Sequence, residues 1–162
     1  DGVGRRSVVY ASPGASVTQA KLIAPREEPA GRGSVVDEAA RWARLYCLSV
    51  FTTDRPGEVN VRTVKKVRVL GGPASQPRKL GEAELEEDGS FHLEVPPDQP
   101  LKLELLSASG AVVRSSAWIF ARKKENRGCI GCHEDPELTP ENREAKAIVK
   151  KPVSVIRAGG AR

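Results

Sequence analysis

The stretch Phe91-His92-Leu93-Glu94-Val95 alternates apolar and polar side chains, which is the period of two of a β-strand with one buried face. An Asp88-Gly89 pair stands just before it, and Asp-Gly beside an alternating run is a strong signal for a β-hairpin turn. Pro96-Pro97 ends the strand, because proline cannot donate to a sheet ladder. We therefore expect the apolar residues of this strand to face a core and His92 to lie on the outer face.

Similar short runs occur on both sides of this strand, at intervals of about 10 residues. They cover residues 45–51, 59–64, 67–70, 80–86, 101–105, 111–114 and 118–120. No long helical stretch separates them, which argues against a parallel α/β fold. The sequence predicts a mainly β fold, an antiparallel β-sandwich of the immunoglobulin-like or transthyretin-like kind.

The sandwich is expected to span residues 34–122, with a short helix over 38–43 capped by Asp37 or Ser34. Residues 1–33, rich in Gly, Pro, Ala and Arg, are expected to form an N-terminal arm. Residues 123–162 are expected to leave the sandwich and to carry one short helix. That helix begins at Thr139-Pro140, runs to about residue 149 and is followed by a basic tail.

The sequence Cys129-Ile130-Gly131-Cys132-His133 is a C-x-x-C-H motif, the arrangement that attaches haem c. Each cysteine sulfur bonds one vinyl group of the porphyrin, and the adjacent histidine then binds the iron. The motif predicts one covalent haem, with Cys129 and Cys132 as thioether residues and His133 as an iron ligand. A zinc site completed by Cys47 or His92, and a thioredoxin-like dithiol, are the alternatives.

The second axial position of the iron has few candidates in this chain. The chain contains no methionine, which excludes His/Met ligation from within it. His92 is the one other histidine, and we weigh it evenly as a distal iron ligand and as a surface residue. Tyr10, Tyr46, a lysine, water and a histidine of a neighbouring subunit remain candidates. Cys47 is expected to be a small buried hydrophobe.

Several strings around the motif are typical of one family. They are residues 63–70, 89–96, 101–110, 116–119, 127–134 and 138–143. Over roughly residues 45–153 the chain resembles the haem-bearing β-domain of proteins similar to the hydrazine synthase alpha subunit. The resemblance implies the haem roles of Cys129, Cys132 and His133. In that enzyme subunit a tyrosine shortly after the motif binds the iron, and residues 134–138 contain no tyrosine, so the resemblance does not imply hydrazine synthesis.

The amino-acid composition and charge limit the kinds of partner that we expect for this protein. The net charge is +5 and only 4% of residues are aromatic, which argues against nucleic acid binding. No apolar run has the length of a membrane span. The chain opens on Asp1 with no signal peptide, so we expect a processed, exported protein of the periplasm or cell exterior.

The sequence favours an electron carrier over an enzyme, because no convincing catalytic constellation accompanies the haem motif. We expect it to pass electrons to other cytochromes or redox subunits, as part of a larger homo- or hetero-oligomeric assembly or filament. One alternative is a haem enzyme or ligand-binding protein with an open iron site. The other is a β-sandwich interaction module in which haem is secondary.

Overall fold

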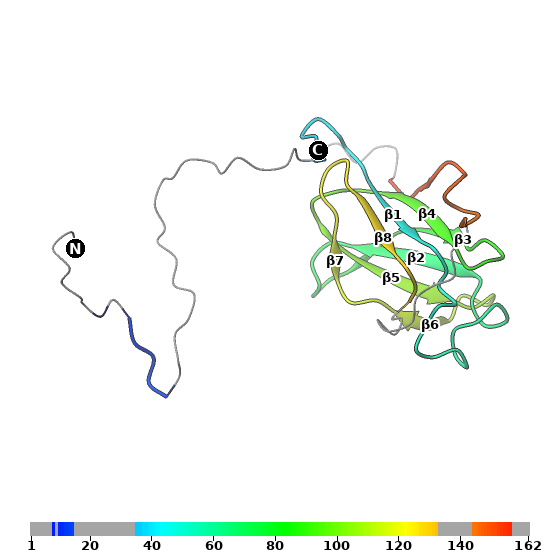
Figure 1. Ribbon diagram of the computed structural model, residues 1–162, viewed down its shortest axis with the longest axis horizontal. Helices are drawn as coiled ribbons and strands as arrows, with labels where there is room; N and C mark the ends of the chain where they lie inside the picture. The colour runs from blue at the N-terminus through cyan, green and yellow to red at the C-terminus, as the bar shows by residue number, and fades with distance from the viewer. Residues whose placement is uncertain (1–7, 9, 15–34, 133–143, 157–162) are drawn as a thin grey trace. The chain divides into compact units, whose positions relative to one another are not determined.

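A computed structural model of the chain describes residues 8, 10–14, 35–132 and 144–156 (Figure 1). The chain divides into two compact units, Asp1–Gly33 and Ser34–Arg162. The first unit corresponds in sequence to the expected N-terminal arm, and most of it lies outside the described residues. The second unit holds all of the strands and both motif cysteines.

The second unit is built from two β-sheets. One sheet has the order β8-β1-β4-β9, and its strands are β1 (Ala43–Cys47), β4 (Phe91–Val95), β8 (Asn126–Cys129) and β9 (Val153–Ser154). The other has the order β3-β2-β5-β6, with β7 also paired to β5. Its strands are β2 (Lys66–Gly71), β3 (Arg78–Glu84), β5 (Pro100–Leu106), β6 (Val112–Ser115) and β7 (Ile119–Phe120). The described residues contain no helix, so the prediction of a mainly β sandwich is confirmed.

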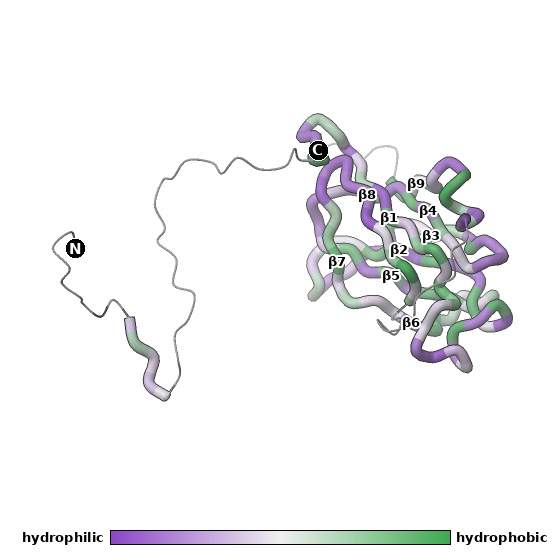
Figure 2. Tube along the Cα trace, in the orientation of Figure 1, coloured by the Kyte–Doolittle hydropathy of each residue, from purple (hydrophilic) through white to green (hydrophobic). Residues whose placement is uncertain are grey.

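The core lies between the sheets and follows the predicted alternation. In β4 the three apolar residues are buried, while His92 and Glu94 are only half-buried. Strand β2 contributes Val67 and Val69 to the same core from the other sheet. Figure 2 shows hydrophobic and hydrophilic residues alternating along such strands. Each fully buried Val, Leu or Phe side chain contributes about 1.5–3 kcal/mol of transfer free energy, which makes this pattern the main determinant of the fold.

The turn before β4 forms, but the predicted hairpin does not, because β3 and β4 belong to different sheets and the turn carries the chain from one sheet to the other. Gly89 has a φ of 78°, a left-handed conformation that favours glycine, and its N–H donates to the Glu86 carbonyl over 2.9 Å. Asp88 Oδ1 accepts hydrogen bonds from the Ser90 N–H (3.0 Å) and the Ser90 hydroxyl (2.6 Å). The side chains of the turn therefore satisfy its backbone and fix the start of β4.

Residues 59–64 form turns, so the prediction of a strand there is wrong. Val59 and Val64 are both buried although they are five positions apart and would lie on opposite faces of a strand, whereas Val61, which alternates with Val59, is exposed. The amide oxygen of Asn60 accepts hydrogen bonds from the N–H groups of Arg62 (3.0 Å) and Thr63 (3.3 Å). By accepting these two bonds, the Asn60 side chain satisfies backbone N–H groups that a strand would pair with a neighbouring strand. It therefore stabilises turns instead of a strand.

Neither predicted helix is found among the described residues. Over 38–43 the Asp37 carboxylate accepts from the Ala39 N–H (3.0 Å) in a single turn, and β1 begins at Ala43. Of the second helix, residues 139–143 lie outside the described part, 144–145 are irregular and 146–149 form turns. The reason is visible at Lys146 and Ala147, whose N–H groups donate to Asp88 Oδ2 and Ser90 Oγ, both over 2.9 Å. Contacts with residues 88–90, just before β4, therefore replace helical hydrogen bonds.

The sequence predicts that the chain leaves the sandwich after Arg122. This prediction is wrong, because β8 and β9 both come after Arg122 and belong to one of its sheets. Both strands pair in parallel, β8 with β1 and β9 with β4, whereas the other pairs are antiparallel. Because β8 ends at Cys129, the first cysteine of the motif belongs to the sheet.

Candidate functional site

The cysteine motif begins on β8, at the edge of its sheet. In the parallel register Cys129 lies opposite Cys47, and Gly128 lies opposite Tyr46. Cys47 is 1% exposed and belongs to the core, and Cys129 packs against that core while staying half-buried. The Cys129 side chain is therefore on the core side of the sheet, at an edge that solvent reaches.

The loop that follows β8 is fixed by backbone hydrogen bonds to residues 48–52. The three bonds are Leu48 N–H to Cys129 O (3.0 Å), Ser49 N–H to Ile130 O (3.2 Å) and Cys132 N–H to Thr52 O (3.0 Å). Gly131 lies so close to this segment that a Cβ there would stand 2.0 Å from the Thr52 carbonyl oxygen. The C-x-x-C loop therefore lies flat against the chain that follows β1.

Both motif cysteines pack against the core and are half-buried. Thioether formation needs two thiols held three positions apart on an accessible edge, and this loop supplies that arrangement. Cys129 and Cys132 are thus placed as thioether attachment of a haem c would require. His133 itself lies outside the described residues.

Cys47 is buried, as predicted, and its thiol lies 3.9 Å from the Ile130 carbonyl oxygen as a weak hydrogen-bond donor. Sequence spacing alone gave no sign that this cysteine lies beside the motif. Within the described ranges no three His, Cys, Asp or Glu side chains are grouped so that they could hold a metal ion.

His92 lies on the outer face of the same sheet, as predicted. It is opposite Tyr46 in the register, and the two rings meet edge-on with centroids 6.4 Å apart and planes at 85°. His92 Nδ1 is buried without a hydrogen-bond partner among the described residues. Because Cys129 faces the core and His92 faces outward two strands away, the structure does not bring these two side chains together.

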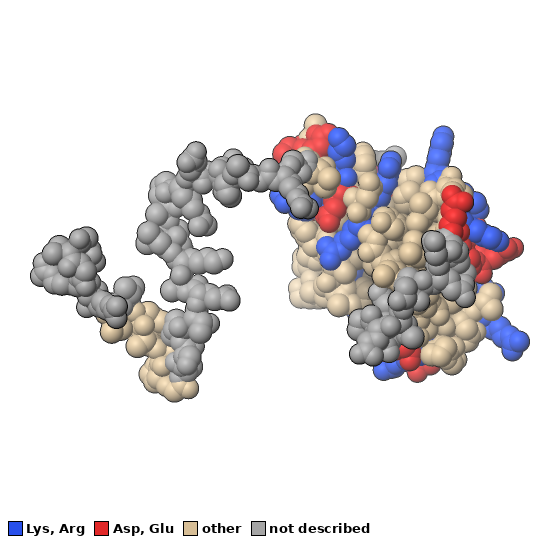
Figure 3. Space-filling view, in the orientation of Figure 1, with Lys and Arg blue, Asp and Glu red and all other residues tan. Residues whose placement is uncertain are grey.

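The basic residues that precede β8 are held in ion pairs. Lys123 Nζ lies 2.9 Å from Glu38 Oε2, and Lys124 Nζ lies 3.3 Å from Asp37 Oδ2. The pKa of Asp37 is lowered, first by the hydrogen bond from the Ala39 N–H and then by that from Lys124. On the face shown in Figure 3, Lys and Arg are interspersed with Asp and Glu and form no single basic patch.

Sequence reasoning missed three parts of this site: the close approach of Tyr46 to Gly128, that of Gly131 to Thr52, and the docking of residues 48–52. The two glycines were the available signal, since glycine beside a motif often marks a close backbone approach. The partner in each approach comes from far away in the chain, and so no local pattern reveals it.

The chain matches a family model described as the hydrazine synthase alpha subunit middle domain, over residues 47–134. This range contains β2–β8 and the whole C-x-x-C-H motif. A comparison with curated proteins finds no match. Among the described residues there is no helix with the length and apolar character needed to cross a membrane.

Among solved structures, hydrazine synthase from Kuenenia stuttgartiensis is similar, with a TM-score of 0.59 and 22% sequence identity. The similarity covers 68% of this chain but only 20% of that one, and it supports the fold alone. A 9R-lipoxygenase from Cyanothece also aligns over 70% of this chain, at 14% identity. Its TM-score of 0.34 is too low to support an argument.

These comparisons confirm the resemblance to the hydrazine synthase alpha subunit. They also correct one prediction: the preference for an electron carrier that is not an enzyme is wrong, because the matching family is a domain of an enzyme's subunit. The covalent haem stays a prediction.

Proposed function

The chain belongs to the hydrazine synthase alpha subunit middle-domain family, and from this premise we propose that it is a haem c domain of a redox enzyme assembly. Cys129 and Cys132 form the thioether bonds, and His133 binds the iron. The domain exchanges single electrons with other redox centres of that assembly. The chain spans 20% of the solved relative's length, so the activity of the complete enzyme is part of the proposal.

The observation that supports this proposal best is the docking of the C-x-x-C loop on residues 48–52. Three backbone hydrogen bonds and the close approach of Gly131 hold both cysteines against the sandwich edge. A fixed loop keeps the two sulfurs at one separation and leaves them half-exposed. Haem, when bound, supplies a one-electron iron couple. The chain's own contribution is to hold that group at the edge of the sheet, where a partner can approach.

The compartment and the partners follow from the same chemistry. Haem c is attached by machinery outside the cytoplasm, so we place the protein in the periplasm or outside the cell. Other redox subunits are its partners, in a homo- or hetero-oligomer. No nucleic acid is involved, in agreement with the mixed charges of the visible surface (Figure 3).

A second candidate function, ligand binding at an open iron site, is favoured by the position of His92. The chain has no methionine, and His92 lies on the sheet face opposite to Cys129. An iron whose second axial position is open binds small ligands such as carbon monoxide when it is reduced. Rapid carbon monoxide binding at neutral pH would favour this function over a sealed electron relay.

Intact mass tests the attachment. The protein is expressed with a haem c maturation system and exported, and the mass is compared with that of the polypeptide. We expect an excess of one haem, reduced in Cys129→Ala and Cys132→Ala and lost in the double variant. Cys47→Ala is the matched control, since this cysteine is not part of the motif, and it should keep the haem. A wild-type mass equal to that of the polypeptide alone contradicts the proposal and favours the alternative of a zinc site.

A further inference from the structure

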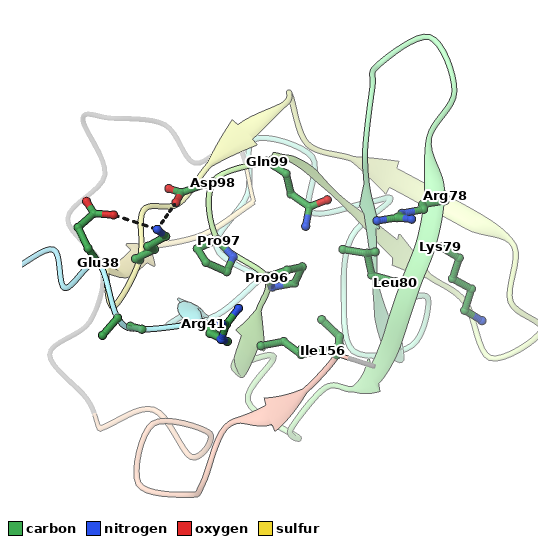
Figure 4. A pocket seen from close by; sticks show the side chains of 14 residues that line it. Glu38, Arg41, Arg78, Lys79, Leu80, Pro96, Pro97, Asp98, Gln99 and Ile156 are labelled. Carbon is green, nitrogen blue, oxygen red and sulfur yellow. Dashed lines mark hydrogen bonds and ion pairs between the residues drawn. The ribbon is translucent and has the colours of Figure 1, made fainter. Parts of the chain in front are cut away.

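A groove lies on the second unit where Lys123 and four further segments meet (Figure 4). These are the turn 38–41, the start of β3, the turn 96–99 between β4 and β5, and residues 155–156 after β9. Its volume is ≈ 780 Å³, within the range of about 300–1,000 Å³ that is usual for small-molecule sites. None of its residues belongs to the C-x-x-C loop.

The two carboxylates in the lining share one cation. Lys123 Nζ lies 2.9 Å from Glu38 Oε2 and 3.8 Å from Asp98 Oδ2, so one ammonium serves both. This contact lowers the pKa of Glu38, whose carboxylate stays ionised and paired. Two carboxylates and one ammonium leave one net negative charge on this side of the groove.

Two guanidinium groups in the lining are not compensated in this way. Neither Arg41 nor Arg78 forms a side-chain hydrogen bond or an ion pair with another residue in the described part of the chain. In Figure 4 both side chains and that of Gln99 are directed toward the hollow. Guanidinium binds carboxylate, sulfonate and phosphate groups through paired hydrogen bonds.

Apart from Lys79, whose ammonium pairs with Glu82, the rest of the lining is apolar. Leu80, Pro96, Pro97 and Ile156 all line the groove, and all four are half-buried. An apolar floor with a few convergent polar groups is the usual composition of a small-molecule site. A ligand that satisfies both parts needs one negative group and an apolar body.

We propose that this groove binds a small amphipathic anion, with its acidic group paired to a guanidinium of the lining, that of Arg41 or Arg78, and its apolar body on Leu80 and the two prolines. The inference is independent of the haem, because it uses no residue of the motif.

Isothermal titration calorimetry of the full chain tests it with three probes. 8-Anilinonaphthalene-1-sulfonate carries both the apolar body and the acid, N-phenyl-1-naphthylamine carries the body alone, and inorganic phosphate is an acid without the body. We expect the sulfonate to bind with a stoichiometry of one and at least roughly tenfold more tightly than either other probe. No binding of the sulfonate, or equal binding of the sulfonate and the uncharged amine, overturns the proposal.

Variants locate the site. The double substitution Arg41→Gln and Arg78→Gln should weaken sulfonate binding roughly tenfold and leave amine binding unchanged. Arg62→Gln removes an exposed arginine elsewhere on the surface and should change neither. Leu80→Ser should weaken both aromatic probes. An equal loss in Arg62→Gln, or no loss in the double variant with an unchanged circular dichroism spectrum, overturns the assignment.

Discussion

The ring of Tyr46 lies over Gly128, so that a Cβ at residue 128 would stand 2.5 Å from Tyr46 Cζ. On its other side Tyr46 meets the edge of the His92 ring. Gly128, Tyr46 and His92 therefore form a row across β8, β1 and β4 on the outer face of the sheet. The neighbouring row, which contains Cys129 and Cys47, faces the core. The Tyr46 ring in this outer row covers the outward-facing side of β8, the strand on which the motif begins.

Gly128→Ala should displace the Tyr46 ring and lower the free energy of unfolding by about 1 kcal/mol. The cost is modest because the atoms in conflict are at the far end of a side chain that can rotate. Urea unfolding of wild type, of each single variant and of the double variant with Tyr46→Ala measures it. The penalty should shrink in the Tyr46→Ala background. An equal penalty in both backgrounds would mean that Tyr46 is not the obstacle.

Gly131→Ala should have a larger effect, about 3 kcal/mol or more, because the nearest atom that the new Cβ meets is the Thr52 carbonyl oxygen, a backbone atom that cannot rotate away. The C-x-x-C loop has to leave residues 48–52, and we expect the fraction of chains that carry haem, read from intact mass, to fall as well. Gly57→Ala is the matched control. A Cβ at Gly57 meets no atom within 4 Å, so its stability should change by less than about 0.5 kcal/mol. Wild-type stability in Gly131→Ala would show that the loop is not docked in this way.

His92→Ala should leave the electron paramagnetic resonance and optical spectra of the haem protein unchanged. His92 faces outward and lies two strands from β8, with Tyr46 between them. Tyr46→Phe keeps the ring and provides a comparison for changes in the surroundings of His92. Conversion of a low-spin signal to a high-spin one in His92→Ala alone would show that this histidine reaches the iron.

Glu82 should make the stability of the sandwich depend on pH in the acidic range. Its pKa is lowered from the ordinary value of 4.5, first by the hydrogen bond from Lys79 and then by that from Arg68. Because the unfolded chain takes up this proton more readily, the stabilisation is complete above the unfolded pKa and is lost as the pH falls through the folded one.

Urea midpoints of wild type and Glu82→Gln between neutral pH and pH about 3 measure this effect. The difference between the two proteins should be largest at neutral pH and should diminish as the pH falls. Glu58→Gln removes an exposed carboxylate whose pair with Arg55 is longer, at 3.6 Å, and should show a smaller change. A Glu82→Gln difference that stays constant over this range would exclude the carboxylate as the cause.

Much of the sandwich could be predicted from local pattern. Strand β4 and its turn at Gly89 are found as expected, because alternation and a left-handed glycine are properties of adjacent residues. The error at 59–64 shows the limit of that reasoning: two buried valines anchor a loop there, and Asn60 supplies the hydrogen bonds.

The strand that carries the motif could not be predicted in this way. β8 reads Asn-Arg-Gly-Cys, has no apolar alternation and is drawn mostly hydrophilic in Figure 2. It forms because β1 offers it a free parallel edge, and such pairing depends on the assembled sheet. The motif residues were evident from spacing alone, whereas their docking on residues 48–52 depends on tertiary structure.

The pairing of β1 with β8 also affects when the motif thiols become covered during folding. Cys47 and Ile130, which are in contact at 3.9 Å, are separated by 83 positions along the chain. During synthesis β1 emerges long before β8 exists, and contacts of such high sequence separation close late in folding. Until they close, both motif thiols are on an open chain, and afterwards they are half-buried against the core. The interval before closure is therefore when the thiols are easiest to reach, and sandwich folding competes in rate with any modification of them.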